Sequence, residues 1–362
     1  MKKFFLSPLL FSLLFCLSIS AQKIDKPTLT PAEPTPAQKQ LIREGARLHD
    51  QKLYAEAIEN HEKVLRECPT CVLAIYERTL SLYYLKDYKR TLESAFEGLK
   101  YKSKEIPLFY GLIANVYDDQ GNPKKAVELY RQGIEMLGGD KEYEPYLSSL
   151  YYNLGVTNVR QKQMKEAREN LKKAVPLNFK YASPHSLLSE VFIAGNYKIP
   201  ALLAASRLIS LEINTQRAQR AALIIQNVLQ GGVSQGKSPK DININVDFNA
   251  PKDEGDFNSL DLMLGISKVG TDITGESKNQ TEEEKFASQI ESIIGFLETE
   301  SKIKSTFAGQ NYLPFMVEMK RRGYVKPFAY IVLYHRGNEA AQKWLTANNQ
   351  KAIDFLKWAK SY

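Results

Sequence analysis

The residues best suited to chemistry in this 362-residue sequence are two cysteines, Cys68 and Cys71, in the order Cys-Pro-Thr-Cys. Such a pair can carry out thiol–disulfide exchange when it follows a strand in a βαβ unit. The flanking sequence instead predicts helix, turn and helix, so that setting is missing. We therefore expect a short disulfide between Cys68 and Cys71 that closes a turn in an oxidising compartment. Free thiols, or a redox or metal role, are the alternatives.

Other chemistry-bearing groups do not form recognisable sites. Asp118 and Asp119 are adjacent, so on a helix their side chains point about 100° apart and make a poor acid–base pair. We expect a solvated or ligand-facing patch there. Residues 241–252 superficially resemble a calcium loop, but Val246 stands where glycine is needed and Lys252 where a carboxylate is required. The histidines are widely scattered: His49, His61, His185 and His335.

Motifs for catalysis are also missing after residue 21. The sequence contains no nucleophile elbow, phosphate loop, zinc-binding histidine pair or dinucleotide fingerprint. We predict no catalytic, cofactor or metal site, and a protein that is not an enzyme. An enzyme of an unrecognised class in residues 259–362 is the alternative that stays open.

The N-terminus predicts export. Lys2 and Lys3 precede an apolar run from Phe4 to Leu17, which is followed by small residues up to Ala21. This is the pattern of a signal peptide, expected over residues 1–21 and removed in the mature protein. The run is about fourteen residues, whereas a membrane-spanning helix needs about twenty. We expect an exported protein that is periplasmic, with secretion as the alternative.

Charge is unevenly distributed along the chain. The formal net charge is +8, but residues 251–300 hold 12 Asp and Glu against 4 Lys, and residues 301–362 hold 11 Lys and Arg against 3 acids. We expect the two blocks to lie against each other. The alternative is that the basic tail, with its longest run at 320–322, contacts an anionic envelope surface. No dense basic run is present, which favours contact between the two blocks over this alternative. We expect no nucleic-acid partner.

A recurring pattern organises the first half. Ala57, Thr91, Ala126 and Ala167 stand in equivalent surroundings, with gaps of 34, 35 and 41 residues. Small residues recur twelve positions before and seven positions after most of these anchors, which allows successive helices to approach closely. Turn residues fall between the paired segments, at Lys86-Asp87 and at Gly121-Asn122-Pro123. The small residues before the anchors are Gly45, Thr79, Ala114 and Gly155.

A period near 34 with paired helices resembles the tetratricopeptide repeat over residues 38–212. The third unit fits the pattern of that family closely, with Tyr110, Ile113, Ala114, Tyr117, Gly121, Ala126, Tyr130 and Gly133. The resemblance implies a solenoid whose concave groove is lined by the first helix of each pair. In the fifth unit Pro200 occupies the anchor position, and we expect its second helix to begin at Ile199 or Pro200.

The resemblance also implies a binding function. Tyrosines offer rigid contact area and a hydroxyl, which suits the binding of a protein or peptide segment. By repeat register, the predicted groove residues are Tyr76, Tyr83, Tyr84, Asn115, Asp118, Tyr152, Arg160 and His185. For each tyrosine taken singly, packing between hairpins is the competing interpretation.

The predicted fold class is all-α: a tetratricopeptide-repeat solenoid of helical hairpins followed by a small, mostly helical C-terminal domain. Residues 1–21 are the signal peptide, 22–37 a disordered Pro-rich linker, and 38–230 the array with its capping helix. Residues 231–258 form a linker with an extended segment, in which Ile242, Ile244, Val246 and Phe248 alternate with polar residues. Residues 259–362 form the helical domain, for which we recognise no family.

Within that domain, Ser259–Ile266 is expected to be a short helix. Thr281 and Glu284 predict a capping box that opens a longer one. Further helices are expected at 312–322, 327–336, 338–346 and 350–360. The apolar stripe predicted to face the core comprises Phe286, Ile290, Ile293, Ile294 and Leu297, and the core is completed by Trp344, Phe355, Leu356 and Trp358.

Together these patterns favour an exported interaction scaffold that binds a protein or peptide segment, as part of a cell-envelope assembly. The competing hypotheses are a module that binds the envelope surface through its basic tail and an unrecognised enzyme. The oligomeric state and the identity of the partner do not follow from the sequence.

Overall fold

The computed structural model describes residues 24–231, 233–235, 242–244, 250–260, 263 and 280–362. The predicted signal peptide at 1–21 lies outside these residues, as do the predicted strand positions Val246 and Phe248. Among the helices that are described, none has the length and apolar character needed to cross a membrane.

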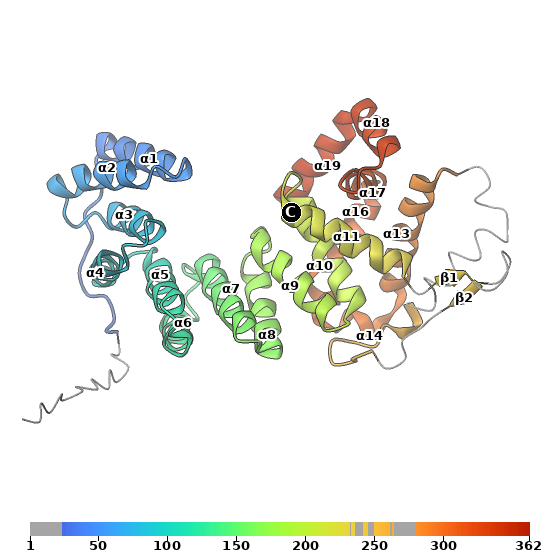
Figure 1. Ribbon diagram of the computed structural model, residues 1–362, viewed down its shortest axis with the longest axis horizontal. Coiled ribbons are helices and arrows are strands. Elements are labelled where there is room, and N and C mark those ends of the chain that lie inside the picture. The colour runs from blue at the N-terminus through green and yellow to red at the C-terminus, as the bar shows by residue number, and fades with distance from the viewer. Residues whose placement is uncertain (1–23, 232, 236–241, 245–249, 261–262, 264–279) are drawn as a thin grey trace, which may run out of the picture.

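Residues 36–211 form five successive helical hairpins, and an eleventh helix follows them. Figure 1 shows the hairpins side by side in an arc, with α3, α5 and α7 on its inner side. We call α1 to α11 the repeat array. Its helices are α1 (Pro36–Asp50), α2 (Tyr54–Glu67), α3 (Val72–Tyr84), α4 (Tyr88–Gly98), α5 (Ile106–Asp119), α6 (Pro123–Leu137), α7 (Glu144–Arg160), α8 (Met164–Leu177), α9 (Ala182–Ala194), α10 (Lys198–Leu211) and α11 (Gln216–Gln230).

The turn inside each hairpin has the same backbone geometry. A residue with positive φ stands at the same place in every hairpin, and the intervals between these residues are 34, 35, 41 and 34. The first three intervals equal those between the sequence anchors, and the fourth confirms the fifth unit. The five residues are Lys52, Lys86, Gly121, Lys162 and Asn196.

Small residues lie where helices approach most closely, as predicted. A Cβ built on Gly45 would lie 2.4 Å from Cε1 of His61, and one built on Gly155 would lie 2.9 Å from Cγ of Leu171. Both contacts are shorter than real Cβ atoms tolerate, so α1 packs on α2, and α7 on α8, only because glycine is present.

The fifth hairpin begins its second helix at Lys198, one residue before the predicted range. Pro200 is the third residue of α10, where a missing backbone N–H costs nothing because the first four N–H groups of a helix have no intrahelical acceptor. The helix is therefore neither shortened nor broken.

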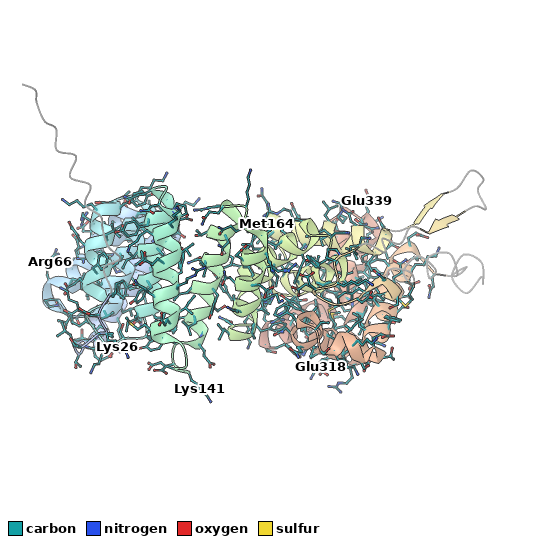
Figure 2. All side chains as sticks on the ribbon, turned by 90° about the horizontal axis from the view of Figure 1, so that it is seen from below. Lys26, Arg66, Lys141, Met164, Glu318 and Glu339 are labelled. Carbon is teal, nitrogen blue, oxygen red and sulfur yellow. The ribbon has the colours of Figure 1, made fainter. Side chains whose placement is uncertain are left out.

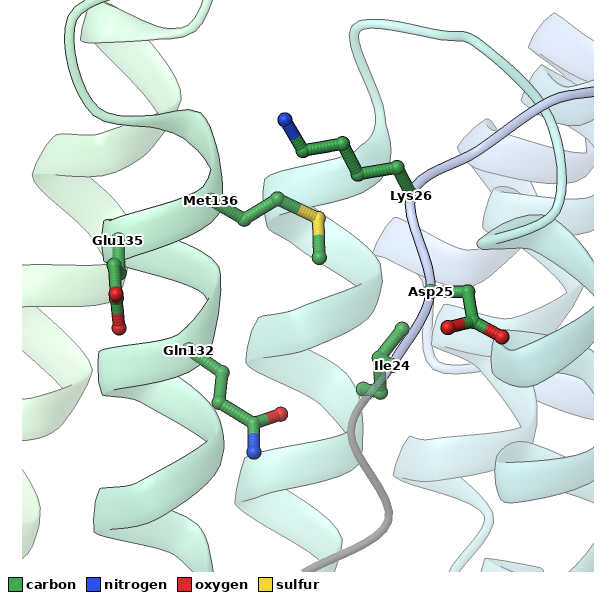
Figure 3. A pocket seen from close by; sticks show the side chains of 6 residues that line it. All are labelled: Ile24, Asp25, Lys26, Gln132, Glu135 and Met136. Atoms are coloured by element: carbon green, nitrogen blue, oxygen red, sulfur yellow. The ribbon is translucent and has the colours of Figure 1, made fainter.

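The expectation of a disordered segment at 22–37 is wrong for residues 24–35, which we call the N-terminal strap. Its backbone pairs with the loops between hairpins: Leu29 N–H donates to the Lys100 carbonyl, Lys102 N–H donates to the Leu29 carbonyl, and Ala32 N–H donates to the Thr70 carbonyl. These bonds use main-chain groups, which a Pro-rich segment still supplies. Figure 3 shows the other end of the strap, residues 24–26, facing Gln132, Glu135 and Met136 of α6 across an open cavity of about 690 Å³.

A small two-stranded sheet follows the array. β1 (Val233–Gln235) pairs antiparallel with β2 (Ile242–Ile244), with Ser234 opposite Asn243. The extended segment predicted at Ile242 and Ile244 is thus a strand. Of the short helix predicted at 259–266, the residues described, 259–260 and 263, are helical.

The C-terminal domain is helical, as predicted, and its capping box at Thr281 and Glu284 is present. The predicted stripe on α13 is buried, and Phe355 and Trp358 pack in the same core. The helices are α13 (Glu282–Thr299), α14 (Ser301–Lys304), α15 (Phe307–Asn311), α16 (Leu313–Arg321), α17 (Val325–Tyr334), α18 (Glu339–Ala347) and α19 (Asn349–Ser361). Gly323 and Gly337, both with positive φ, follow α16 and α17.

One hydrophobic core joins the domain to the end of the array. It contains Leu208 and Ile209 of α10 together with Phe315 of α16 and Phe355 of α19. Arg207, fully buried, donates to the Ala359 carbonyl over 2.8 Å and lies over the ring of Phe315. The C-terminal domain therefore covers the fifth hairpin.

The acidic and basic blocks of the second half meet in part. Lys326 of α17 forms an ion pair of 3.0 Å with Glu284 of α13. Asp253 and Glu254 of the acidic block contact the array instead, through Arg168 of α8. The predicted contact between the blocks thus holds for α13 and α17, while the linker is bound to the fourth hairpin.

Candidate functional site

Three successive inner helices are linked at their C-terminal ends by a polar network. Tyr83 of α3 donates to Asp119 of α5 over 2.8 Å. Arg160 of α7 reaches back to Asp118 over 2.7 Å, and Thr157 donates to the same carboxylate over 3.0 Å. Each inner helix therefore contributes its last turn to one continuous surface, which we call the inner face.

The two adjacent carboxylates have different environments. The Asp118 side chain is only 7% exposed, whereas that of Asp119 is 26% exposed. Burial, together with the hydrogen bond to Asp119, raises the pKa of Tyr83, so its hydroxyl stays protonated and donates. Asp118 is thus used for structure, and Asp119 is the more accessible acceptor.

An aromatic cluster extends this surface toward the first hairpin. Tyr84 stacks on Tyr54 with ring centroids 5.6 Å apart, and His49 meets the edge of Tyr84 at 5.0 Å. Tyr84 also meets the edge of the Tyr83 ring at 5.5 Å, yet it is 52% exposed. About half of the Tyr84 side chain therefore stays accessible on this surface.

Three other residues that the repeat register assigns to the groove, Tyr76, Asn115 and Tyr152, are engaged in contacts within the protein. Tyr76 is mostly covered, lies edge-on to Phe109 of α5, and has its pKa raised chiefly by burial. Asn115 accepts a hydrogen bond from the buried Tyr130 hydroxyl. Tyr152 is half-buried and packs on Tyr181 with centroids 5.5 Å apart. Tyr76 therefore does not join Tyr83 and Tyr84 in one cluster.

His185 is not on an accessible surface, and that prediction is wrong. Its side chain is fully buried, with one ring nitrogen 3.0 Å from the Tyr312 hydroxyl and the other 3.0 Å from the Phe179 carbonyl. The physical reason is that α15 and α16 pack onto the fifth hairpin, so the position that register assigns to the groove is covered by the C-terminal domain.

Two aromatic residues of the inner face were missed: Tyr54 and Tyr88, the first residues of α2 and α4. Tyr88 lies 3.5 Å from Asp119, hydroxyl to carboxylate. Both tyrosines stand three residues before an anchor, at Ala57 and Thr91. The repeat interval itself could have identified them.

Cys68 and Cys71 are both free thiols in the structure, so the predicted disulfide is not formed here. Cys71 is buried at the start of α3, and burial raises the pKa of its thiol. Its reactivity as a thiolate is therefore low. Oxidation of the pair outside the cell stays a prediction, which the change in protein mass on reduction and alkylation can test.

Within the described part of the chain, no group of three or more His, Cys, Asp or Glu side chains is placed to hold a metal ion. The absence of enzymatic activity stays a prediction.

A family model for the tetratricopeptide repeat matches residues 108–136 and 148–181, which lie in the third and fourth hairpins. The chain thus contains tetratricopeptide repeats at these residues. The first, second and fifth hairpins have the same positive-φ turn, so the array has five units of this geometry. No curated protein matches the sequence.

Several solved structures are similar in fold at low identity. The Thermus thermophilus tetratricopeptide-repeat protein TTC0263 is 17% identical, covering 52% of this chain and 99% of its own, with a TM-score of 0.43. PilW, a type IV pilus biogenesis factor, is 18% identical over 54% and 100% of the two chains, with a TM-score of 0.38. PilF of Pseudomonas aeruginosa is 14% identical over 78% and 97%, with a TM-score of 0.39.

Proposed function

We propose that this tetratricopeptide-repeat protein is an exported, periplasmic scaffold that binds a protein or peptide segment on the inner face of its first four repeats, within an envelope assembly. The observation that carries the proposal is the aromatic cluster of the exposed Tyr84 with the half-buried His49 and Tyr54, beside the Tyr83–Asp119–Arg160 network. A rigid aromatic surface next to hydrogen-bonding groups suits a partner segment with apolar and polar side chains in alternation.

The fifth repeat takes no part in this proposal, because the C-terminal domain covers it. The binding surface is thus limited to the inner helices α1, α3, α5 and α7 together with Tyr54 and Tyr88, the first residues of α2 and α4. A partner approaching it meets Tyr84 at one end and Arg160, 56% exposed, at the other.

The structure offers little support for binding through the basic tail. In the run at 320–322, Arg321 and Arg322 both pair with Glu318 over 2.6 Å. These contacts lower the pKa of Glu318 to about 2, so it stays charged and neutralises part of the run. The tail therefore carries less free positive charge than its sequence indicates.

A site-specific photo-crosslinking amino acid at position 84, used in the native host, tests the proposal. The control is the same group at Tyr334, which is 43% exposed on the C-terminal domain. We expect a discrete crosslinked protein from position 84 alone, and its loss when Tyr54 and Arg160 are replaced by alanine. Identical crosslinks from both positions, or no effect of the alanines, would contradict the proposal.

Export is tested separately by N-terminal sequencing of the protein from a periplasmic extract. We expect a mature chain that lacks the predicted signal peptide at residues 1–21. A chain found only in the cytoplasm with residues 1–21 intact would exclude the exported scaffold but leave the binding face untouched.

A further inference from the structure

The turns inside the hairpins lie along one edge of the array, which we call the turn edge. It consists of residues 50–56, 85–90, 119–125 and 160–166. Figure 2 shows Met164 of the turn edge on one side of the array and Lys141, in the loop between the third and fourth hairpins, on the opposite side. The Tyr83–Asp119 and Arg160–Asp118 hydrogen bonds connect the second, third and fourth repeats beside this edge, and the stacked rings of Tyr54 and Tyr84 connect the first repeat to the second.

Lysines line this edge. Every repeat from the first to the fourth contributes at least one lysine that is exposed and forms no ion pair with any residue that the structure describes. These lysines are Lys52, Lys86, Lys89, Lys124, Lys162 and Lys165.

Local backbone structure does not require lysine at these positions. Lys52, Lys86 and Lys162 have positive φ, which disfavours a side chain like that of lysine, and the same position holds Gly121 and Asn196 in the other two hairpins. Either alternative is better suited to that geometry.

The other three lysines also oppose a local preference. Lys89, Lys124 and Lys165 lie in the first turns of α4, α6 and α8, where the helix dipole favours an acid and disfavours a cation. Six lysines thus occupy positions at which the local structure favours other residues.

Acidic residues on the turn edge only partly balance this charge. Asp87 caps α4 and pairs with Arg90, while Asp118 and Asp119 are bound by Arg160. Apart from these, the edge carries the exposed acids Asp50, Glu56 and Glu166. Six unpaired lysines against three such acids leave the edge with an excess of positive charge.

Large apolar side chains project between the lysines. Leu53 is 42% exposed, Leu85 is 49% exposed and Met164 is 46% exposed. Leu53 and Leu85 are direct sequence neighbours of Lys52 and Lys86, and Met164 stands two residues after Lys162. Exposed apolar groups flanked by lysines are the pattern by which proteins attach to anionic bilayers.

We propose that the turn edge of repeats one to four docks onto the surface of an anionic lipid bilayer. The lysine ammonium groups bind lipid phosphates, and Leu53, Leu85 and Met164 enter the boundary between headgroups and acyl chains. A nucleic acid would use the lysines but not the apolar side chains. The turn edge and the inner face share Tyr54, Tyr88, Asp119 and Arg160, but the lysines and the apolar side chains that contact the bilayer are not part of the proposed partner site.

Sedimentation of the mature chain with vesicles tests the proposal, using phosphatidylglycerol mixed with phosphatidylcholine and phosphatidylcholine alone. We expect binding to the anionic vesicles only, with an affinity that falls steeply as salt rises. Because each lysine near an anionic surface contributes about fivefold, reversing four of them should weaken binding at least about 100-fold. The variant carries Lys52→Glu, Lys86→Glu, Lys124→Glu and Lys162→Glu.

The matched control reverses four exposed lysines at the opposite edge: Lys102→Glu, Lys104→Glu, Lys141→Glu and Lys180→Glu. It makes the same change in net charge and should retain most of the binding. Equal losses in the two variants, or failure of the wild-type chain to bind anionic vesicles at low salt, would overturn the proposal. Circular dichroism verifies the fold of both variants. Glutamate is favoured at Lys124, in the first turn of α6, and at the positive-φ positions Lys52, Lys86 and Lys162 it replaces a side chain that is already disfavoured there.

A third variant distinguishes insertion of the apolar side chains into the bilayer from electrostatic attraction of the lysines to its surface. Replacing Leu53, Leu85 and Met164 by serine should leave binding at low salt but lower the salt concentration at which half of the protein dissociates. An unchanged dissociation midpoint would mean that the apolar side chains do not enter the bilayer. If reversing the charges of Lys320, Arg321 and Arg322 alone abolished vesicle binding, the bilayer contact would belong to the basic tail and the proposal would be wrong.

Discussion

His185 of α9 and Tyr312, just before α16, are 127 residues apart in the sequence and share a buried hydrogen bond of 3.0 Å. Both side chains are fully buried, and burial lowers the pKa of His185 to about 3. The histidine is therefore neutral at physiological pH. This contact makes the last repeat and the C-terminal domain parts of one folded unit.

Replacing Tyr312 by phenylalanine should lower the free energy of unfolding by about 1–3 kcal/mol, because one buried nitrogen of His185 loses its partner. Chemical denaturation measures the change. Tyr110→Phe is the matched control: Tyr110 is equally buried, but its hydroxyl contacts only the Met136 sulfur, at 3.4 Å, so its cost should be smaller. An equal cost for the two substitutions would show that the bond to His185 contributes nothing specific.

The repeat array was predictable because the interval, the small residues and the turns all report on contacts between neighbouring segments. Gly45 and Gly155 each mark a helix contact that a Cβ would prevent. Local pattern therefore determined the fold of residues 36–211 and the inner position of Tyr83 and Arg160.

The predictions that failed concern residues whose contacts come from segments distant in sequence. Register assigns His185 to a face but does not reveal that Tyr312 covers it. Composition marks residues 24–35 as Pro-rich but does not reveal that Leu29 pairs with the loop at Lys100 and Lys102. Contacts of this kind leave no periodic signal in the sequence.

His61 should make stability depend on pH. It is fully buried against Gly45, neither ring nitrogen has a partner among the described residues, and burial lowers its pKa to about 4. As pH falls from about 6.5 toward 4, the unfolded chain takes up a proton that the folded chain does not, so stability falls over this window. His61→Leu should reduce that loss, since Leu171 occupies the equivalent position against Gly155.

The measurement is the free energy of unfolding of the wild type and His61→Leu at pH 7.5 and pH 5. We expect the leucine variant to gain more at pH 5 than at pH 7.5. His185 contributes with the same sign in both proteins, so some dependence on pH remains. An equal effect of the substitution at both pH values would mean that His61 titrates normally.

Two glycine substitutions should have opposite effects. A Cβ on Gly98 would lie 2.2 Å from Cζ of the buried Phe109, so Gly98→Ala should destabilise by about 1–3 kcal/mol. A Cβ on Gly111, inside α5, meets no atom nearer than 3.6 Å. Gly111→Ala should stabilise by up to about 1 kcal/mol through helix propensity. Thermal unfolding distinguishes them, and a shift of the same sign in both would refute the packing argument.

The linker should be held to the array by a buried ion cluster. Arg168 of α8 is 6% exposed and Glu254 is 4% exposed; Arg168 Nε lies 3.0 Å from the Glu254 carboxylate, and Lys172 pairs with the same carboxylate over 2.9 Å. Removing Arg168 leaves the buried Glu254 carboxylate with Lys172 alone to balance it, so Arg168→Met should cost up to roughly 3 kcal/mol. The double variant Arg168→Met with Glu254→Gln should lose less free energy of unfolding than the sum of the two single variants, because both charges of the pair are then removed together.

Arg321→Met, at an exposed pair with Glu318, serves as the control and should change stability little. Strict additivity in the denaturation cycle would show that Arg168 and Glu254 do not act together.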